Sequence, residues 1–416
     1  MIKLTTKKLT KTEIVRRQLK KYEVSLDELD FKAIKEFKEK MKDLSDSRQK
    51  GKRKYKIWDI VVVTFLAVLG NCNSWEEIKI FAESKKTWLK SFLKLSGGIP
   101  SAITYKRVFA IIKPDELENI CVLFAQDVLK IFASKRDIMN IDGKTDNGSN
   151  RNESITREKV KALNVLNVYS NNLGLCIASQ MIEDKTNEIP TIPLILDKIN
   201  VKGNIITWDA LNTQKTNVET VIKLKGEYVV PLKQNQGAFY NDLVLYFDEK
   251  KLECIKAGNS QSAYKKQIEK CQGNIVTYEY FQTEDISWFQ DLKKWKGIKS
   301  FGLVKKTIIS KHNTIAECRY YISSLYNDIE TFSNAIRLHW SVENKLHWHL
   351  DFTFKQDENS TMDKNALFNL QILKKLSLAF LNDVKRVYNT SLKNIRFKLS
   401  LNYETEILRF FNILAH

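Results

Sequence analysis

The sequence predicts an α/β core built on a mixed β-sheet with helices on both faces, together with a β-rich insertion and an N-terminal all-helical domain. Helical spacing and helix-start signals occur in residues 58–132, and short strands alternate with amphipathic helices in residues 137–247. Strand-like stretches rich in Tyr, Phe, Thr and Ile occur in residues 252–325. A chain of 416 residues with 43% hydrophobic residues is long enough for two or three domains.

The charge balance indicates a polyanionic partner. Lys and Arg outnumber Asp and Glu by 68 to 49, which gives a formal net charge of +19. Nucleic acid is the usual partner of such a chain, an anionic membrane is the second, and a solvated lysine-rich surface is the alternative. The longest apolar run, Ile60–Leu69, is too short to span a bilayer, and the first residues lack the apolar segment of a signal peptide. We therefore expect a cytoplasmic protein with no membrane partner.

Six cysteines lie far apart in the sequence, and none belongs to a CxxC pair. This spacing is typical of reduced thiols and argues against a disulfide framework or a zinc knuckle.

Residues 1–57 form a basic N-terminal segment, and residues 58–135 form the predicted helical domain. The basic segment ends in Arg48–Lys56 (RQKGKRKYK), which is typical of a solvated linker but is also suited to phosphate contacts. In the helical domain, Ser74 and Glu77 form a capping box, Ser101 is a second N-cap, and Pro114 suits the first turn of a long helix. Short helices joined by tight turns permit a helix-turn-helix DNA reader, and a plain helical bundle is the alternative.

The catalytic core is predicted from the element order. Strands are expected at residues 137–141, 162–169, 175–182, 204–208 and 228–232, and helices at residues 188–199, 213–224 and 237–247. The resulting order, βββαβαβα, is that of the ribonuclease-H-like fold. We assign residues 136–250 to the first part of this core, residues 251–328 to the β-rich insertion, and residues 329–416 to the C-terminal helical part of the core. Ligands gather beyond strand ends in such sheets, where Asp142 and Asp209 are predicted to lie.

Three carboxylates in separate elements are candidates for chemistry: Asp142, Asp209 and Glu343. Carboxylates bind Mg²⁺ or Mn²⁺, and two such ions can activate a water or a hydroxyl and stabilise the leaving oxygen of a phosphodiester. Taken singly, an Asp after a strand is more often a turn residue.

Glu343 lies in Thr331–Asp357, a stretch that also holds three of the five histidines. As a regular α-helix, it would place His339, Glu343 and His347 on one face, because they are four residues apart. These three could instead bind zinc, although the order of the residues differs from that of helical metalloprotease sites and Asp142 and Asp209 would have no role.

Other side chains near these acids could assist. Trp208, Trp340 and Trp348 could stack on an unpaired base, and core packing is the alternative role. Lys144, Lys215 and Lys233 follow strand ends and could neutralise phosphate, and each could equally be a surface lysine. Between Leu292 and Lys311, lysines interleaved with aromatic residues suit a nucleic-acid groove or a protected edge strand.

Five motifs carry a resemblance to a known family: IDGKTDNGS (141–149), EDKTNEIPTIP (183–193), ITWDALNTQK (206–215), YVVPLKQNQGAFYND (228–242) and HWSVENKLHWHLDFTFKQD (339–357). In this order they resemble the signatures of DDE transposases of the ISAs insertion-sequence group, also called H-repeat-associated proteins. The N-terminal stretches SDSRQKGKRKY, NSWEEIKIFAE and GGIPSAITYKRVF are similar to the domain associated with these transposases.

The resemblance implies a Mg²⁺-dependent enzyme in which Asp142, Asp209 and Glu343 are catalytic and chelate two ions, Mg²⁺ or Mn²⁺. Its expected activity is DNA cleavage at transposon ends followed by strand transfer. The implied partners are double-stranded DNA carrying terminal inverted repeats, target DNA, and a second copy of the chain in a homodimeric synaptic complex. The alternatives are an inactive or repurposed transposase that only binds DNA, and a nuclease that cuts without joining.

The wider superfamily often has a Tyr and an Arg before the Glu, and a Lys seven residues after it. Those positions hold Ile336, His339 and Leu350 in this sequence, so these roles are open to Arg337, His339 or His347. The expected supporting or DNA-contacting residues are Lys144, Glu188, Lys215, Lys233, Asn235, Arg337, His339, Trp340, His347 and Trp348. Among them, Glu188 is a fourth carboxylate that could support the metal site.

Overall fold

The computed structural model describes residues 31–131, 136–149, 151–152, 159–160, 162–183, 187–258, 262–271, 273–310 and 313–415. Residues 1–30 of the predicted basic segment, and residues 184–186 of the motif at 183–193, lie outside these ranges. The chain forms two compact units. The helical unit comprises residues 1–132, 146–163 and 346–416, and the sheet unit comprises residues 133–145 and 164–345. Residues 346–416 therefore group with the N-terminal helices, whereas the sequence assigns them to the catalytic core.

The first part of the helical unit consists of helices, and those that follow Ser74 and Ser101 and begin at Pro114 start where the sequence predicts. They are α2 (Lys32–Met41), α3 (Ile57–Leu69), α4 (Trp75–Ser84), α5 (Lys86–Leu89), α6 (Ala102–Ile111) and α7 (Pro114–Leu129). Ser74 and Glu77 form the predicted capping box of α4, and the Ser101 side chain accepts a hydrogen bond from the backbone N–H of Thr104 at the start of α6. Pro114 occupies the first turn of α7, where its missing N–H costs no helical hydrogen bond.

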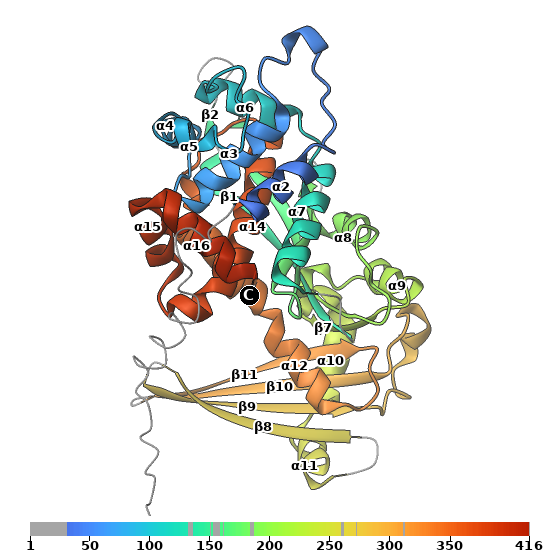
Figure 1. Cartoon of the computed structure of the whole chain (residues 1–416). Helices are drawn as coiled ribbons and strands as arrows, with labels where there is room; N and C mark the ends of the chain where they lie inside the picture. Colours follow the sequence, from blue (N-terminus) through green and yellow to red (C-terminus); the bar gives the residue numbers. More distant parts are fainter. Residues whose placement is uncertain are drawn as a thin grey trace, which may run out of the picture. The chain divides into compact units, whose positions relative to one another are not determined.

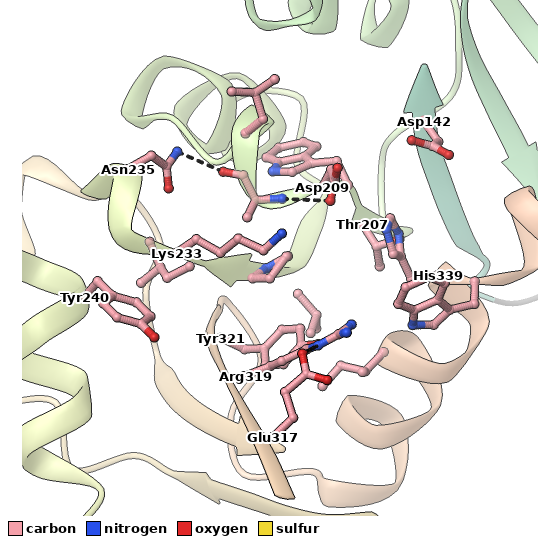
Figure 2. A pocket seen from close by; sticks show the side chains of 18 of the residues that line it. Asp142, Thr207, Asp209, Lys233, Asn235, Tyr240, Glu317, Arg319, Tyr321 and His339 are labelled. Atoms are coloured by element: carbon pink, nitrogen blue, oxygen red, sulfur yellow. Dashed lines mark hydrogen bonds and ion pairs between the residues drawn. The ribbon is translucent and has the colours of Figure 1, made fainter. Parts of the chain in front are cut away.

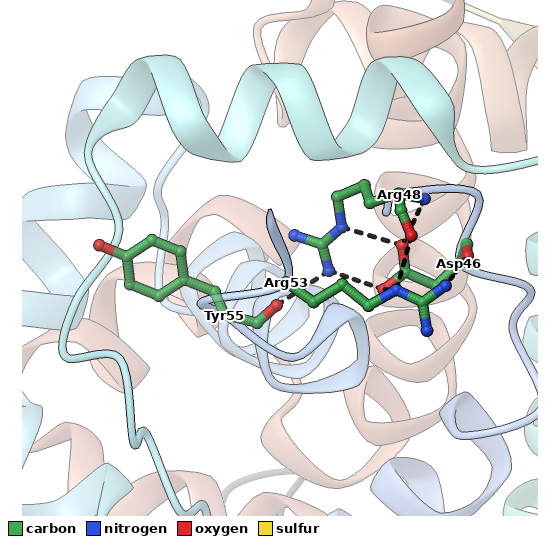
Figure 3. Close-up of polar contacts among 4 residues, drawn as sticks. All are labelled: Asp46, Arg48, Arg53 and Tyr55. Atoms are coloured by element: carbon green, nitrogen blue, oxygen red, sulfur yellow. Dashed lines mark hydrogen bonds and ion pairs between the residues drawn. The ribbon is translucent and has the colours of Figure 1, made fainter. Parts of the chain in front are cut away.

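The basic run Arg48–Lys56 is an ordered turn built on its own arginines (Figure 3). Arg48 donates from Nε and Nη2 to the two carboxylate oxygens of Asp46, at 2.9 and 2.8 Å, and from Nη2 to the carbonyl of Tyr55 at 2.8 Å. Arg53 donates to the carbonyls of Arg48 and Asp46, each at 2.7 Å. The Arg48 hydrogen bond lowers the pKa of Asp46. The prediction of a solvated linker is therefore wrong for these two arginines, because they hold the turn together.

The C-terminal part of the helical unit is organised around a long buried helix, α14 (Lys364–Tyr388), which packs against α3, α6 and α7 (Figure 1). The neighbouring elements are α13 (Trp348–Phe352), η8 (Gln356–Glu358), α15 (Leu392–Leu401) and α16 (Tyr403–Ala415), with a small ladder of β2 (Arg151–Asn152) and β3 (Lys159–Val160). Two buried cations secure the residues that follow α13. Lys374 donates to the carbonyl of Phe354 at 3.1 Å, and Arg396 donates to the carbonyl of Thr353.

The sheet unit contains the predicted mixed sheet. Its first strands are β1 (Ile138–Asp146), β4 (Leu163–Ser170), β5 (Leu175–Ile182), β6 (Ile205–Thr207) and β7 (Glu227–Leu232), in the spatial order β5-β4-β1-β6-β7. β1, β6 and β7 are parallel, and β4 and β5 form the predicted antiparallel pair. Helices α8 (Glu188–Leu196), α9 (Lys215–Lys223) and α10 (Gly237–Tyr246) contribute to one hydrophobic core, and α12 (Ile329–His339) contributes to a second one. This arrangement confirms the predicted ribonuclease-H-like core with helices on both faces.

The β-rich insertion continues the same sheet. It adds β8 (Ser262–Cys271), β9 (Asn274–Thr283), β10 (Ser300–Ile309) and β11 (Thr314–Ser323), which complete a nine-stranded sheet in the order β7-β11-β10-β9-β8 (Figure 1). The link is an antiparallel pair in which Tyr320 of β11 faces Leu232 of β7. The sequence predicts β9, β10 and β11 but misses β8 and the preceding helix α11 (Glu249–Ala257).

Helix α12 is seated on β10 through a glycine. Gly302 lies beneath the fully buried ring of Phe332, and a Cβ added at Gly302 would lie 2.1 Å from Cζ of that ring. The Gly302→Ala substitution is therefore expected to overpack this contact and lower the free energy of unfolding by about 1–3 kcal/mol. Denaturant unfolding measures this, with Gly51→Ala as the control because a Cβ there meets nothing within 4 Å. Equal stability of the Gly302→Ala protein and the wild type would contradict close packing of the Phe332 ring on Gly302.

Two further findings concern the class of protein. Among the described residues, no helix is long and apolar enough to cross a membrane. None of the six cysteines forms a disulfide within the described ranges.

Candidate active site

Two of the three candidate carboxylates are brought together by the register of adjacent strands. In the parallel pair β1–β6, Asn140 lies opposite Thr207. Asp142 and Asp209 each follow this paired stretch by two residues, and both line the same cavity. Asp142 lies within β1 rather than beyond its end as predicted, because β1 continues to Asp146. Asp209 directly precedes the short helix η4 (Ala210–Asn212), and its Oδ1 accepts a hydrogen bond from the backbone N–H of Ala210 at 3.1 Å.

The third carboxylate comes from the region after α12. A carboxylate oxygen of Glu343 lies within 4.8 Å of one of Asp142. Glu343 is exposed and begins η7 (Glu343–His347), a π-helical segment. Such segments occur frequently at functional sites.

The predicted continuous helix over Thr331–Asp357 is wrong. Helix α12 ends at His339, a turn follows at Trp340, and the hydrogen bonds of η7 run from residue i to residue i+5. His339 therefore lies before the turn, whereas Glu343 and His347 lie after it. The three residues do not belong to the one regular α-helix on which the zinc alternative depends.

A cavity of about 950 Å³ in the sheet unit is lined by all three carboxylates. Figure 2 shows Asp142 and Asp209 in its lining. Its other lining residues come from the ends of β6 and β7, from the turn after β7 and the following α10, from β11, and from α12 and the turn after it. They include Thr207, Lys233, Asn235, Tyr240, Glu317, Arg319, Tyr321, His339 and Trp340. The cavity thus combines carboxylates, cations and aromatic rings in one hollow.

A chain of hydrogen bonds orients His339 in this cavity. Asn171 Nδ2 donates to Asn140 Oδ1, and Asn140 Nδ2 donates to Thr207 Oγ1 at 2.9 Å. The Thr207 hydroxyl, which lies 3.0 Å from His339 Nδ1, can then give its own proton to that nitrogen. Burial lowers the pKa of His339, although the charges of Asp142 and Asp209 oppose the change. The lowered pKa favours the neutral form of the His339 imidazole.

Arg319 is a functional candidate that was not predicted from the sequence. It lies in β11, and its Nε donates to Glu317 Oε1 at 2.8 Å. Burial acts to lower the pKa of Arg319, but the hydrogen bond to Glu317 and the charges of Tyr321, Glu317 and Asp209 outweigh it and raise the pKa. The only signal in the sequence is alternation: residues 317, 319 and 321 share one face of a strand.

Several predicted supporting residues also line the cavity. Lys233 is exposed and follows β7, and Asn235 Nδ2 donates to the carbonyl of Ala210 at 3.2 Å. Trp340 lies at the turn after α12 and is 49% exposed, which leaves its ring accessible. Trp208 also contributes to the lining, but its side chain is fully buried in the core and donates to Thr213 Oγ1 at 3.2 Å.

Four other predicted residues of the sheet unit lie outside the lining of this cavity: Lys144, Glu188, Lys215 and Arg337. Glu188 nevertheless lies against β1 next to Asp142 in the sequence, because a Cβ added at Gly143 would lie 2.0 Å from Glu188 Oε1. Its Oε2 accepts a hydrogen bond from Asn212 Nδ2 at 2.6 Å. Arg337 is paired with Glu269, and the ammonium of Lys215 lies 5.8 Å from the ring centroid of Trp295.

The remaining two predicted residues, His347 and Trp348, belong to the helical unit. His347 is buried and is the last residue of η7. Trp348 is half-exposed, and its ring stacks on Phe352 with the centroids 4.6 Å apart.

Comparison with known proteins agrees with this architecture. Residues 133–380 match the family described as Transposase DDE domain, and residues 38–125 match the family described as DDE_Tnp_1-associated. The protein named "Putative transposase YncI" from Escherichia coli O157:H7 is 32% identical over 372 residues, which cover 88% of this chain and 92% of the relative. The protein named "H repeat-associated putative transposase YhhI" from Escherichia coli K12 is 29% identical over 90% of this chain and 98% of the relative.

Among solved structures, a cryo-EM structure of a piggyBac transposase synaptic complex with hairpin DNA matches with a TM-score of 0.37 and 12% identity. The match covers 95% of this chain and 81% of that chain. The family match spans more than half of the 416 residues, and a relative above 30% identity matches along nearly its whole length. The chain therefore belongs to the family of transposases with a DDE domain.

Proposed function

We propose that this chain is an active DNA transposase that cleaves phosphodiester bonds at the ends of an insertion sequence and transfers the freed strand to target DNA. The observation that carries the proposal is the cavity lined by Asp142, Asp209 and Glu343, which come from three separate elements. A metal pair needs ligands from separate elements, because one helix cannot surround it. Within the DDE transposase family, we assign the chain to the ISAs group on the five motifs described above.

The donor set fits the divalent ions that the family implies. Oxygens of Asp142 and Glu343 lie within 4.8 Å of each other, comparable to the roughly 4 Å between oxygens on opposite sides of one Mg²⁺. Asp142, Asp209 and Glu343 would hold two Mg²⁺ or Mn²⁺ ions, with Glu188 behind Gly143 as a supporting carboxylate. When bound, these ions supply activation of the attacking oxygen and stabilisation of the leaving oxygen.

The protein's own residues would bind and orient the DNA. Lys233 would offer an ammonium to phosphate, Asn235 holds the start of η4 through the carbonyl of Ala210, and His339 lines the same cavity. The partners are double-stranded DNA with terminal inverted repeats and target DNA. Two transposon ends must be held together, so we propose that a homodimer forms the synaptic complex. The net charge of +19 favours such polyanionic partners.

The test is an end-cleavage and joining assay on a duplex that carries the inverted repeat flanking this gene, with a labelled target plasmid. We expect cleavage at the repeat boundary and joined product with Mg²⁺ or Mn²⁺, and neither product with EDTA. A duplex with a scrambled repeat is the control.

The other outcomes identify the alternatives. Cleavage without joined product would indicate a nuclease. Binding to the repeat without cleavage under any divalent ion would indicate an inactive or repurposed transposase that acts as a DNA-binding protein. Cleavage that persists in EDTA would contradict the metal-dependent mechanism.

A further inference from the structure

Arg319 occupies a wall shared by two cavities of the sheet unit. The first is the cavity lined by the three carboxylates. The second has a volume of about 380 Å³ and shares Arg319, Tyr321, Ile336 and Trp340 with the first. Tyrosines and cations complete its lining, namely Tyr278, Tyr280, Lys306 and Arg337, with Val304 and Asn344. A nucleic-acid strand suits such a surface, because cations bind its backbone and aromatic rings bind its bases.

Neighbouring side chains hold the guanidinium of Arg319 in place. The hydrogen bond to Glu317 uses Nε, one of the five N–H donors of the group. The guanidinium carbon also lies 5.3 Å from the ring centroid of Trp340. These contacts fix an Arg side chain that is 39% exposed, so little conformational freedom remains to be lost when an anion binds.

The residues around the carboxylate cavity make Arg319 better placed than Arg337 to bind a phosphate there. Among the described residues that line it, Lys233 and Arg319 are the two cations, beside the carboxylates of Asp142, Asp209, Glu317 and Glu343. Arg337, the arginine nearest to Glu343 in the sequence, does not line this cavity and is paired with Glu269. A planar guanidinium binds phosphate through two parallel hydrogen bonds, which a lysine cannot do.

We propose that Arg319 binds a phosphate of the DNA strand at the point where this strand passes from the carboxylate cavity into the second cavity. The insertion, through β11, then supplies the arginine that the residues just before Glu343 lack. This inference rests on the proposed function, since it takes DNA as the substrate of the same site.

The test combines a protein variant with a neutralised phosphate. Duplexes carrying the flanking inverted repeat receive one methylphosphonate at a time, at each phosphate near the cleavage position. In the wild type, we expect one position at which neutralisation lowers the cleavage rate and the affinity by about 10- to 100-fold. On unmodified DNA, the cleavage rate and affinity of Arg319→Ala should be lower than those of the wild type by a similar factor. A methylphosphonate at the sensitive position should lower them by less than about twofold further, because the two changes remove the same interaction. Arg319→Lys should fall between them.

Controls separate this inference from the proposed function. Arg136→Ala removes an arginine that is also paired with a glutamate, Glu227, but lies outside both cavities, and it should keep the wild-type sensitivity. The inference would be overturned if methylphosphonate substitution slowed Arg319→Ala and Arg319→Lys as much as it slows the wild type, at the same phosphate positions. It would also be overturned if Arg337→Ala, rather than the Arg319 variants, lost its sensitivity to the methylphosphonate. If the wild type does not cleave, the proposed function fails. The affinities measured with Ca²⁺ in place of Mg²⁺ would still decide whether Arg319 binds phosphate.

Discussion

Replacing Asp142 with Asn is expected to lower the rate of end cleavage by about 10²–10³-fold or more, while the protein stays folded. The amide has nearly the same shape as the carboxylate but carries no charge, so it is a poor ligand for a divalent ion. Because the Asp142 and Glu343 oxygens lie within 4.8 Å, they should act on the same ion, and Glu343→Gln should give a loss of similar size. Asp209→Asn is expected to behave alike, since all three line one cavity.

The measurement is single-turnover cleavage together with calorimetric titration of Mn²⁺ against each variant. Groups that act as one unit are not additive, so the Asp142→Asn/Glu343→Gln double variant should be scarcely slower than either single variant. Glu219→Gln is the matched control, because Glu219 lies on α9 away from the cavity and pairs with Lys223. Wild-type cleavage by any one of the three single variants would remove that residue from the proposed triad.

Arg396→Met is expected to lower the free energy of unfolding of the helical unit by about 3–5 kcal/mol. Arg396 is fully buried and donates to the carbonyl of Thr353, to the carbonyl of Val68 at 2.7 Å and to Asn73 Oδ1 at 3.1 Å. Its guanidinium carbon also lies 4.3 Å from the ring centroid of Phe354. Methionine fills much of the space but leaves these acceptors without their donor, and a buried acceptor without a partner costs about 1–3 kcal/mol.

Denaturant unfolding followed by far-UV circular dichroism measures this effect. Lys393→Met is the matched control, because it removes one positive charge from an exposed position of the same helix, α15. It should change stability by less than about 0.5 kcal/mol. If both variants unfold at the same denaturant concentration as the wild type, the buried arginine does not stabilise the region after α13.

Local signals in the sequence predict much of the fold, because they act over a few residues. The capping box at Ser74, the N-cap at Ser101 and the proline at Pro114 lie where the helices begin. The strands that carry Asp142 and precede Asp209 are also found from alternation and turn residues, and their order predicts the mixed sheet. The strand register that brings the two aspartates together depends on pairing between distant segments.

The features that the sequence does not predict depend on contacts between residues far apart in the chain. Strand β8 reads SAYKKQIEKC, whose many charges conceal its strand character, because one of its edges faces no other strand of the described sheet. The break after His339 is also not predicted, because the residue pattern around it fits an unbroken regular helix as well as it fits the interrupted one. Arg319 is 24 residues before Glu343, and nothing in the intervening sequence indicates that β11 leads back to the carboxylates.

Strand β8 has a further consequence for how the protein behaves at high concentration. As the outermost strand of the described nine-stranded sheet, it presents backbone groups that another polypeptide could pair with. Lys265, Lys266 and Lys270 line this strand, and an approaching β8 of another molecule would bring the same positive charges. Their mutual repulsion disfavours edge-to-edge pairing of two copies, the contact from which amyloid-like aggregation starts.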